Sequence, residues 1–484
     1  MSKRHNIGML VVLALALSTA RAQDTSTSPA APPPPVGASA DANPQEPGTP
    51  PTPGYGQENP APPISENPPL SGLDLPGLEP HAAPLSYLQP GAHISESLDS
   101  NVSGAIGGSS VRSITRAFGS LTLQRLWSNY DLALDYIGGV GYYDSRGLGA
   151  KLVQALNVNQ RIKWKRGQLS LRDNFSYLPE GNFGFAYGSL GPQENLLGGG
   201  FLGGGAFGAL GQVPRIMNLS AAEISQSLSP RSAITLTGGY GFMHFTGTDS
   251  QGITYLGSSQ VSVQAGYNRI LTPHDQIALV YGYQGFRFSP IAGAGTAFHT
   301  QVVQVMYGHR ISGRMDFLAG AGPQITSLTN FTLLGPLKTN RLSVAGRASL
   351  RYRFPKTMVD LAFERYTTSG SGFFAGAQSN VVRLRADRPI SRVWSGFVDM
   401  GYAHNTRLQT AAAGVNARSY GFGFAGLGAR RSFGRNFGVF ASYQFNELYF
   451  DNSFCGGLAT CSRTSQRHIG TVGLDWTPRP IRLD

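Results

Sequence analysis

The sequence predicts an all-β protein: a transmembrane antiparallel β-barrel of about eighteen strands, preceded by a disordered, proline-rich segment. Three observations predict this class. Charged residues make up only 14% of the chain, against about 25% in soluble domains. No apolar run after the N-terminus is long enough for a membrane-spanning helix, and long alternating runs follow one another beyond residue 95. Because only helices and closed barrels satisfy every backbone group in hydrocarbon, these features together favour a barrel.

Residues 1–22 have the pattern of a secretion signal. Lys3 and Arg4 precede an apolar stretch over residues 7–17, and a small-residue site places the cleavage between Ala22 and Gln23. The alternative, an N-terminal membrane anchor, would need a longer apolar stretch. No cysteine follows the site, which argues against a lipid anchor.

Residues 23–92 read as a periplasmic linker. Prolines recur between residues 32 and 90, mixed with Ala, Gly, Ser and Glu, so this segment cannot bury a core and should sample polyproline II. At about 3 Å per residue an extended linker of this length reaches far across the periplasm. We interpret it as a spacer; the alternative is a contact with peptidoglycan or a periplasmic protein.

Residues 93–484 form the predicted barrel, in which short turns alternate with longer connections. Short turns are expected at residues 128–129, 166–167, 230, 273–274, 312–313, 355–356, 390–391 and 434–435. Longer connections are expected at residues 145–147, 179–214, 247–252, 290–296, 327–337, 369–375, 408–415 and 451–463.

The strand count follows from these marks. Seventeen strands begin at Val111, and a weaker strand over residues 93–106 completes an even number, eighteen, with sixteen as the alternative. An even count places both termini in the periplasm. A β-propeller has a similar repeat, but its blades pack four short strands into the span that two long strands fill in this chain.

Alternation within the strands predicts which face meets lipid. In the strand over residues 341–354, Leu342, Val344 and Leu350 share one parity, and four arginines share the other with Ser343 and Ser349. An arginine on the lipid face near the midplane costs about 2–4 kcal/mol, so the arginines are expected to face inward. By the same reasoning the apolar parities over residues 152–164 and 420–424 are expected to face lipid. Asp173 shares a parity with Leu171 and Phe175, which predicts a bulge or an early strand end.

The last strand carries Gly470, Val472, Leu474 and Trp476 on one parity. In this it resembles the bacterial outer-membrane β-barrel superfamily, whose last strand commonly ends in an aromatic residue that the barrel-assembly machinery reads. The chain departs from that pattern because residues 477–484 continue past Trp476. The resemblance implies an outer-membrane location and identifies no particular transport family. Aromatic side chains near strand ends are expected to form interfacial girdles: Trp127, Trp164, Tyr281, Tyr283, Tyr402, Tyr443 and Trp476.

A barrel of this width encloses an aqueous channel unless something fills it. The charged side chains expected to line it are Arg161, Lys163, Arg172, Arg341, Arg347, Arg351, Arg353, Arg383 and Arg385, with the acids Asp131, Asp135, Asp360 and Glu364. The cationic excess, and a chain net charge of +12, favour passage of anionic solutes or sugars. The alternative is that these charges pair and only stiffen the wall.

Two connections carry further expectations. The connection over residues 179–214 contains Leu, Phe and many glycines, and is interpreted either as a constriction folded into the barrel mouth or as a mobile surface loop. Cys455 and Cys461 are expected to form a disulfide in an oxidising compartment; free thiols are the alternative. Two thiols without a nearby histidine pair cannot complete a metal site, so we expect no metal.

The sequence contains no motif for an enzyme, a cofactor or nucleic acid. The histidines are scattered over different hairpins at positions 244, 274, 299, 309, 404 and 468, and export removes nucleic acid as a partner for the basic chain. The expected partners are outer-membrane lipid and lipopolysaccharide, whose phosphates attract basic rims. A structural or adhesin barrel with a plugged lumen and functional outer loops is the alternative to a channel, and a barrel hydrolase is the third interpretation.

Overall fold

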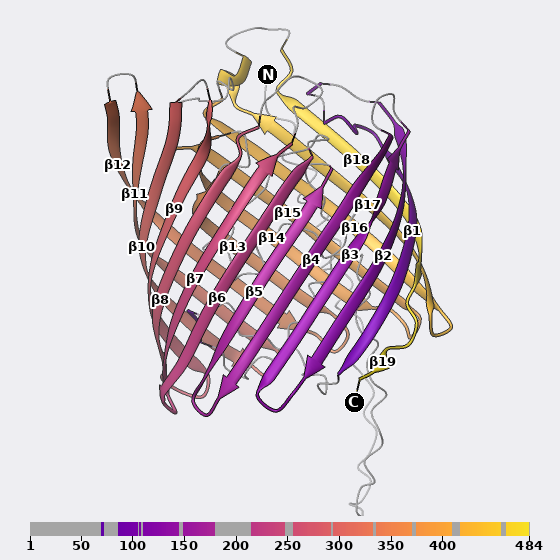
Figure 1. Cartoon of the computed structure of the whole chain (residues 1–484), viewed down its shortest axis with the longest axis horizontal. Helices are drawn as coiled ribbons and strands as arrows, with labels where there is room; N and C mark the ends of the chain where they lie inside the picture. Colours follow the sequence, from indigo (N-terminus) through magenta and orange to yellow (C-terminus); the bar gives the residue numbers. More distant parts are fainter. Residues whose placement is uncertain are drawn as a thin grey trace, which may run out of the picture. The chain divides into compact units, whose positions relative to one another are not determined.

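The chain folds into a closed antiparallel β-barrel, shown in a computed structural model in Figure 1. The structure describes residues 69–71, 86–104, 106–107, 110–144, 149–179, 214–246, 255–291, 294–332, 335–369, 374–408, 417–455 and 461–483. All of them belong to one compact unit, Gly48–Asp484. The predicted signal peptide, most of the proline-rich linker and the connection over residues 180–213 lie outside the described residues.

Eighteen strands close the wall, as predicted. They are β1 (Tyr87–Asp99), β2 (Arg112–Leu126), β3 (Tyr130–Tyr143), β4 (Gly149–Trp164), β5 (Gly167–Leu178), β6 (Arg215–Ser229), β7 (Ser232–Phe245), β8 (Ser258–Ile270) and β9 (Asp275–Ile291). They continue with β10 (Ala294–Ser312), β11 (Met315–Thr332), β12 (Gly335–Arg353), β13 (Met358–Thr368), β14 (Ala377–Pro389), β15 (Trp394–Arg407), β16 (Ser419–Phe433), β17 (Phe437–Phe450) and β18 (Thr464–Trp476). Each strand pairs with the next, and β18 returns to β1 in a register that runs from Ala92↔Trp476 to Asp99↔Ile469. The barrel therefore has no open sheet edge over that register.

The first strand lies earlier than predicted. It begins at Tyr87, not at His93, and it ends at Asp99. Pro90 had suggested linker, since proline removes a ladder hydrogen bond. In the structure Pro90 pairs with Leu121 of β2 and precedes the β18 pairing, which starts at Ala92, so no strand is paired with it on the other side.

The C-terminal residues extend the seam between β1 and β18. A short strand, β19 (Ile481–Arg482), pairs with Leu88 and Tyr87 at the start of β1. The residues after Trp476, which depart from the superfamily pattern, thus continue the sheet beside the first strand.

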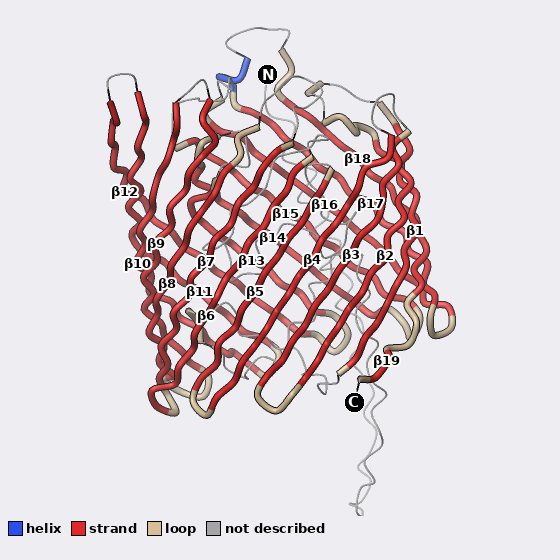
Figure 2. The backbone as a smooth tube through the Cα atoms, in the orientation of Figure 1, coloured by secondary structure: helices blue, strands red, loops and turns tan. Residues whose placement is uncertain are grey.

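Connections sort to the two ends of the barrel, as the tan segments in Figure 2 show. The short turns fall where they were predicted, at the end where β1 begins and β18 stops. Two predicted long connections, at residues 290–296 and 327–337, are wrong, because β9 through β12 continue through most of them. Proline and glycine had suggested loops there. However, Pro290 of β9 lies beyond the last residue paired with β8, and Pro336 of β12 lies before the first residue paired with β13. Each strand is therefore an edge strand on one side at its proline, and an edge tolerates proline.

The two faces of the wall differ in chemistry. Large apolar side chains on one parity are exposed, among them Leu152, Val261, Leu279 and Leu474, while polar side chains on the other parity are buried. Outward-facing Trp127, Trp164, Trp394 and Trp476 are the four tryptophans of the chain, and all lie next to short turns or strand ends of the same side. This arrangement matches an interfacial girdle at the short-turn end. Among the described residues, no helix has the length and apolar character needed to cross a membrane.

Two predictions about single strands are wrong, one about which side chains face lipid and one about a strand irregularity. Tyr420 and Phe422 are buried inside the barrel, and it is Leu427, on the opposite parity of β16, that is exposed. Asp173 neither ends nor bulges β5, which pairs regularly with both neighbours. Its carboxylate faces outward and accepts hydrogen bonds from Asn218 (3.1 Å) and Ser220 (2.5 Å) of β6.

Candidate functional site

The inner wall is the candidate functional surface, because strand alternation brings the predicted charged residues onto it. On β4 the exposed Leu152 and Trp164 have even numbers, so Arg161 and Lys163 face inward. The same parity argument places the other predicted pore-lining residues of β3, β5, β12, β13 and β14 on the inner face: Asp131, Asp135, Arg172, Arg341, Arg347, Arg351, Arg353, Asp360, Glu364, Arg383 and Arg385. Arg341 differs from the rest. The β12–β13 pairing starts only at Gly346, so Arg341 lies on a part of β12 that pairs with β11 but not with β13.

Several of these cations are paired with acids on the same or the adjacent strand. Lys163 forms an ion pair with Asp131, and Arg351 Nε lies 3.0 Å from Asp360 Oδ2. Arg383 binds Asp399 through two bonds of 3.0 and 2.6 Å, the bidentate geometry that arginine favours with a carboxylate. These contacts reduce the net positive field of the lumen. Pairing of the charges was the alternative considered from the sequence, in which they only stiffen the wall. A further pair, Arg385–Asp387, lies within β14 at 2.8 Å.

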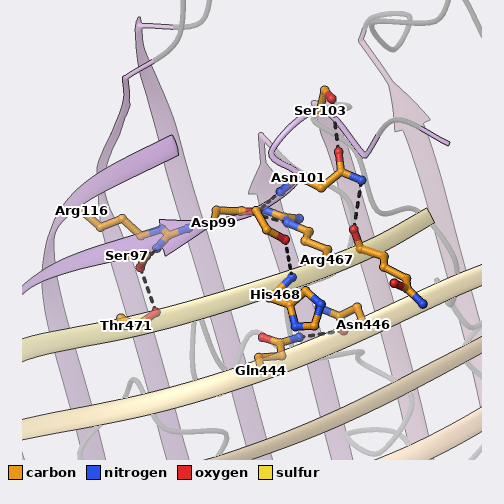
Figure 3. Close-up of polar contacts among 12 residues, drawn as sticks. Ser97, Asp99, Asn101, Ser103, Arg116, Gln444, Asn446, Arg467, His468 and Thr471 are labelled. Atoms are coloured by element: carbon orange, nitrogen blue, oxygen red, sulfur yellow. Dashed lines mark hydrogen bonds and ion pairs between the residues drawn. The ribbon is translucent and has the colours of Figure 1, made fainter. Parts of the chain in front are cut away.

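A second set of charges lies at the closing seam, which we define by Ser97, Asp99, Arg116, Arg467 and Thr471 (Figure 3). Asp99 of β1 and Arg467 of β18 are both fully buried, and their ion pair joins the first and last strands at 2.5 Å. Arg116 of β2 donates to Ser97 Oγ at 2.5 Å, and Ser97 shares a 2.8 Å hydrogen bond with Thr471 of β18. The seam is therefore held by side chains from three strands as well as by backbone pairing.

Nearer the short-turn end, the same three strands carry a chain of hydrogen bonds between an acid, a histidine and a serine. His93 Nδ1 lies 2.7 Å from Asp475 Oδ1, and His93 Nε2 lies 3.0 Å from Ser120 Oγ. Asp475 is buried, and its second oxygen lies 3.6 Å from Arg430 Nε. The distances are those of a nucleophile, a base and an orienting acid. A Cβ at Gly91 would meet Ser120 Oγ at 2.4 Å, so glycine leaves room for that hydroxyl.

Sequence reasoning missed the residues of the seam and of this hydrogen-bonded chain. The signal was present in β18, where Arg467, Thr471 and Asp475 alternate with the exposed Val472 and Leu474. In β1, however, few apolar residues alternate with the buried Asp99, so the local pattern there is weak. Only the long-range β1–β18 register brings Asp99 to Arg467.

The long-connection end of the lumen is lined by apolar side chains. One cluster joins inward residues of the wall, including Phe245, Tyr420 and Phe450, to Tyr255 and Phe374 of the connections. A second cluster joins inward phenylalanines of β9 and β10 to Leu256 and Ala375. The β7–β8 and β13–β14 connections thus pack against the inside of the mouth. The constriction predicted from residues 179–214 falls on residues outside the described part of the chain.

The β17–β18 connection is held by a disulfide and a carboxylate. Cys455 and Cys461 are bonded to each other. Asp451 accepts hydrogen bonds from the backbone N–H groups of Arg418 (2.9 Å), Ser419 (2.7 Å) and Ser453 (3.0 Å). Burial raises the pKa of Asp451, but these hydrogen bonds and that of the Ser453 hydroxyl outweigh burial and hold its pKa below the ordinary value. Within the described ranges, no cluster of His, Cys, Asp and Glu has the makings of a metal site.

Solved structures with a similar fold include transport proteins and outer-membrane proteins. The unliganded ferric citrate transporter FecA matches at 12% identity and a TM-score of 0.43, over 82% of this chain and 64% of that one, so the chain spans less than two thirds of its length. The outer membrane protein OpdK of Pseudomonas aeruginosa matches at 10% identity and a TM-score of 0.38, over 81% and 98%. OccK2 (OpdF) of Pseudomonas aeruginosa, in complex with glucuronate, matches at 10% identity and a TM-score of 0.40, over 82% and 97%. No protein-family model and no curated protein matches the sequence.

Proposed function

We propose that this protein is an outer-membrane channel through which small hydrophilic solutes diffuse. The observation that carries the proposal is the closed eighteen-strand wall with exposed apolar side chains outside and polar, charged side chains inside. A wall of this kind is stable only where its outer face meets hydrocarbon, and at this strand number the interior is wide enough for an aqueous path.

The proposed orientation has the short turns and both termini on the periplasmic side. Short periplasmic turns and longer outer connections are the rule for barrels of this kind, and the export signal expected over residues 1–22 agrees with it. In this orientation the disulfide-bonded connection faces outward, where basic residues such as Arg463 meet lipopolysaccharide phosphates. The barrel-assembly machinery and, through the linker, peptidoglycan or a periplasmic protein are the further proposed partners.

The proposed solutes are anions or neutral sugars. Arginine and lysine outnumber acids among the thirteen charged residues predicted for the lumen, nine to four, and basic rings favour anions in pores. Because Asp131, Asp360 and Asp399 neutralise some of these cations, we expect the anion preference to be modest.

Conductance across a planar bilayer tests the proposal. The mature protein in a potassium chloride gradient should give unitary currents, with a reversal potential that has the sign of the chloride equilibrium potential. A reversal potential with the sign of the potassium equilibrium potential would refute the anion preference. The absence of current from correctly folded protein, including the Leu70 variant considered below, would refute the channel.

A second candidate function, hydrolysis in the lumen, is favoured by the chain Ser120–His93–Asp475. In that function Ser120 Oγ would attack an ester carbonyl and displace the alcohol, leaving an acyl-enzyme. His93 would take the hydroxyl proton and give it to the departing alcohol, Asp475 would orient the imidazole, and water would then hydrolyse the acyl-enzyme to release the acid. Labelling with a fluorophosphonate distinguishes the two functions. A hydrolase requires labelling that disappears in Ser120→Ala and falls in His93→Gln, whereas a channel with a structural hydrogen-bond chain predicts no labelling and unchanged conductance in Ser120→Ala.

A further inference from the structure

A short piece of the proline-rich linker lies against the inner wall. Leu70 and Ser71 are both fully buried, although their partners lie in strands between 164 and 277 residues away in sequence. The partners come from β7, β8, β9, β10, β11 and β12. We define the docking site by the inward residues Thr235, Gln264, Gly266, Asn268, Ala278, Val280, Met306, Gly308, Leu318 and Arg347.

The leucine occupies an apolar recess. Leu70 packs against Ala278, Val280, Met306 and Leu318, which together form one buried cluster. A Cβ at Gly308 would approach Leu70 Cδ2 to 3.0 Å, so the absence of a side chain in β10 provides part of the recess. The site therefore fits an aliphatic side chain of about this size.

The serine is bound at every polar group it has. Its backbone N–H donates to Asn268 Oδ1 at 3.0 Å, and its backbone oxygen accepts from Gln264 Nε2 at 2.5 Å. Its hydroxyl contacts Thr235 Oγ1 and Asn268 Nδ2, each at 2.5 Å. A Cβ at Gly266 would come within 2.2 Å of Ser71 Cβ, so this glycine is needed for the close approach.

One charged residue completes the site. Arg347, predicted from the sequence as a pore-lining cation, donates from Nη2 to the backbone oxygen of Leu70 at 3.1 Å. The wall thus binds both the carbonyl oxygen of Leu70 and the N–H of Ser71, and it contacts both side chains. Such matched contacts are typical of a peptide-binding site.

The site lies toward the short-turn end of the lumen. Asn268 is two residues from the end of β8, Ala278 is three residues into β9, and the register joins them directly. Leu318 is likewise three residues into β11. A segment held there narrows the path at the end where the linker joins β1.

We propose that the inner wall carries a peptide-binding site for a Pro-Leu-Ser segment, and that the chain's own Pro69–Ser71, whose last two residues lie in a turn, occupies it as a tethered plug. The proposal rests on the channel proposed above. A tether keeps the effective concentration of the segment in the millimolar range, so the site can hold it most of the time and still release it. Opening then requires only undocking, with the barrel wall unchanged.

Two matched variants test the plug by single-channel recording. Leu70→Asp removes the aliphatic anchor, and Gly266→Val fills the space of Ser71 from the wall. Ala265→Val places the same final side chain on the outward face of β8 and is the control. We expect the first two to raise the time-averaged current at least twofold over the full chain, and the control to leave it unchanged. A synthetic peptide with the sequence of residues 67–72, added from the short-turn side, should restore the block in Leu70→Asp but not in Gly266→Val.

Formation of an engineered disulfide measures docking of the segment independently of the current. Ser71→Cys combined with Thr235→Cys should close a disulfide that shifts mobility on a non-reducing gel, and Ser71→Cys with Gln284→Cys, an inward position on β9, should not. Docking with equal currents in all variants would overturn the plug and leave the channel standing. A lack of current in every variant would overturn the channel itself, and equal cross-linking of both cysteine pairs would overturn the site.

Discussion

The closing seam and the docking site are both parts of the inner wall, yet they satisfy their buried polar groups in different ways. At the seam, Asp99 and Arg467 come from strands that are already paired, so the ion pair forms whenever the barrel closes. At the docking site, Asn268 and Gln264 bind a segment nearly 200 residues away that no strand pairing holds in place. Partners within the wall make the seam permanent, whereas a partner on a tether makes occupancy of the docking site conditional. One wall therefore combines a fixed structural region with a region able to switch.

The largest effect is expected from breaking the seam. Asp99→Ala leaves Arg467 buried without its carboxylate, and removing one partner of a buried pair costs about 3–5 kcal/mol. Denaturant unfolding of the detergent-solubilised barrel, followed by tryptophan fluorescence, should show this loss. Glu447→Gln is the control, since Glu447 accepts only an exposed hydrogen bond from Gln466; its change should stay within about 0.5 kcal/mol.

The double variant Asp99→Leu with Arg467→Met sharpens the same point. Replacing both members of a buried pair with apolar residues is often neutral, so most of the stability lost in Asp99→Ala should return. Equal destabilisation of the single and double variants would show that the seam depends on the attraction between Asp99 and Arg467. It would contradict the view that the loss in Asp99→Ala comes from leaving Arg467 buried without a partner.

Undocking should have a smaller and separable effect. Burial of a leucine side chain contributes about 1.5–3 kcal/mol, which corresponds to a roughly 10- to 100-fold population change at about 1.4 kcal/mol per factor of ten. A Pro69→Cys probe should therefore react with a maleimide faster by about that factor when Gly266→Val is also present. Ala265→Val should leave the rate unchanged. The native cysteines do not interfere because they form a disulfide.

The sequence predicted the parts of the fold that depend on local patterns. Parity and turn residues predicted eighteen strands, the short turns and the inward arginines of β12, because each depends on a few neighbouring residues. Strand boundaries near Pro90, Pro290 and Pro336 were predicted wrongly, since whether a strand tolerates proline depends on which strands are paired on either side. Tyr420 and Phe422 were wrongly predicted to face lipid, because connections that fold into the mouth supply an apolar environment inside the barrel.

The docking site could not be predicted from local patterns. Leu70 and Ser71 lie in a stretch whose composition is that of a linker. Their role depends on small residues, Gly266 and Gly308, that only the strand register brings together with Asn268 and Met306. The available signal was weak, because small inward residues such as Ala155, Ser170 and Ala221 also occur elsewhere on the wall.

Ion selectivity should respond to the paired charges by a smaller amount. Asp399→Asn removes the partner of Arg383, so the inner wall becomes more basic and the reversal potential should move further toward chloride. Arg383→Gln should move it in the opposite direction. Asp173→Asn is the matched control, because that carboxylate faces outward among Asn218 and Ser220 and should leave selectivity unchanged.

The smallest effect is expected at the outer connection, where one carboxylate, that of Asp451, binds the backbone of Arg418 and Ser419; at the docking site several groups share that task. The folded pKa of Asp451 lies below its ordinary value, which is about 3.9 in an unfolded chain. Its stabilisation is therefore fully present above about pH 3.9 and is lost as the pH falls through the lower, folded pKa. Hydrogen exchange of peptides containing Arg418 and Ser419 should show protection at pH 7 that Asp451→Asn reduces, and acid should reduce it in the native chain only. Asp387→Asn, at the opposite end of the barrel, should leave that protection unchanged. If Asp451→Asn remains fully protected at pH 7, the disulfide alone orders the connection and the carboxylate contributes nothing to it.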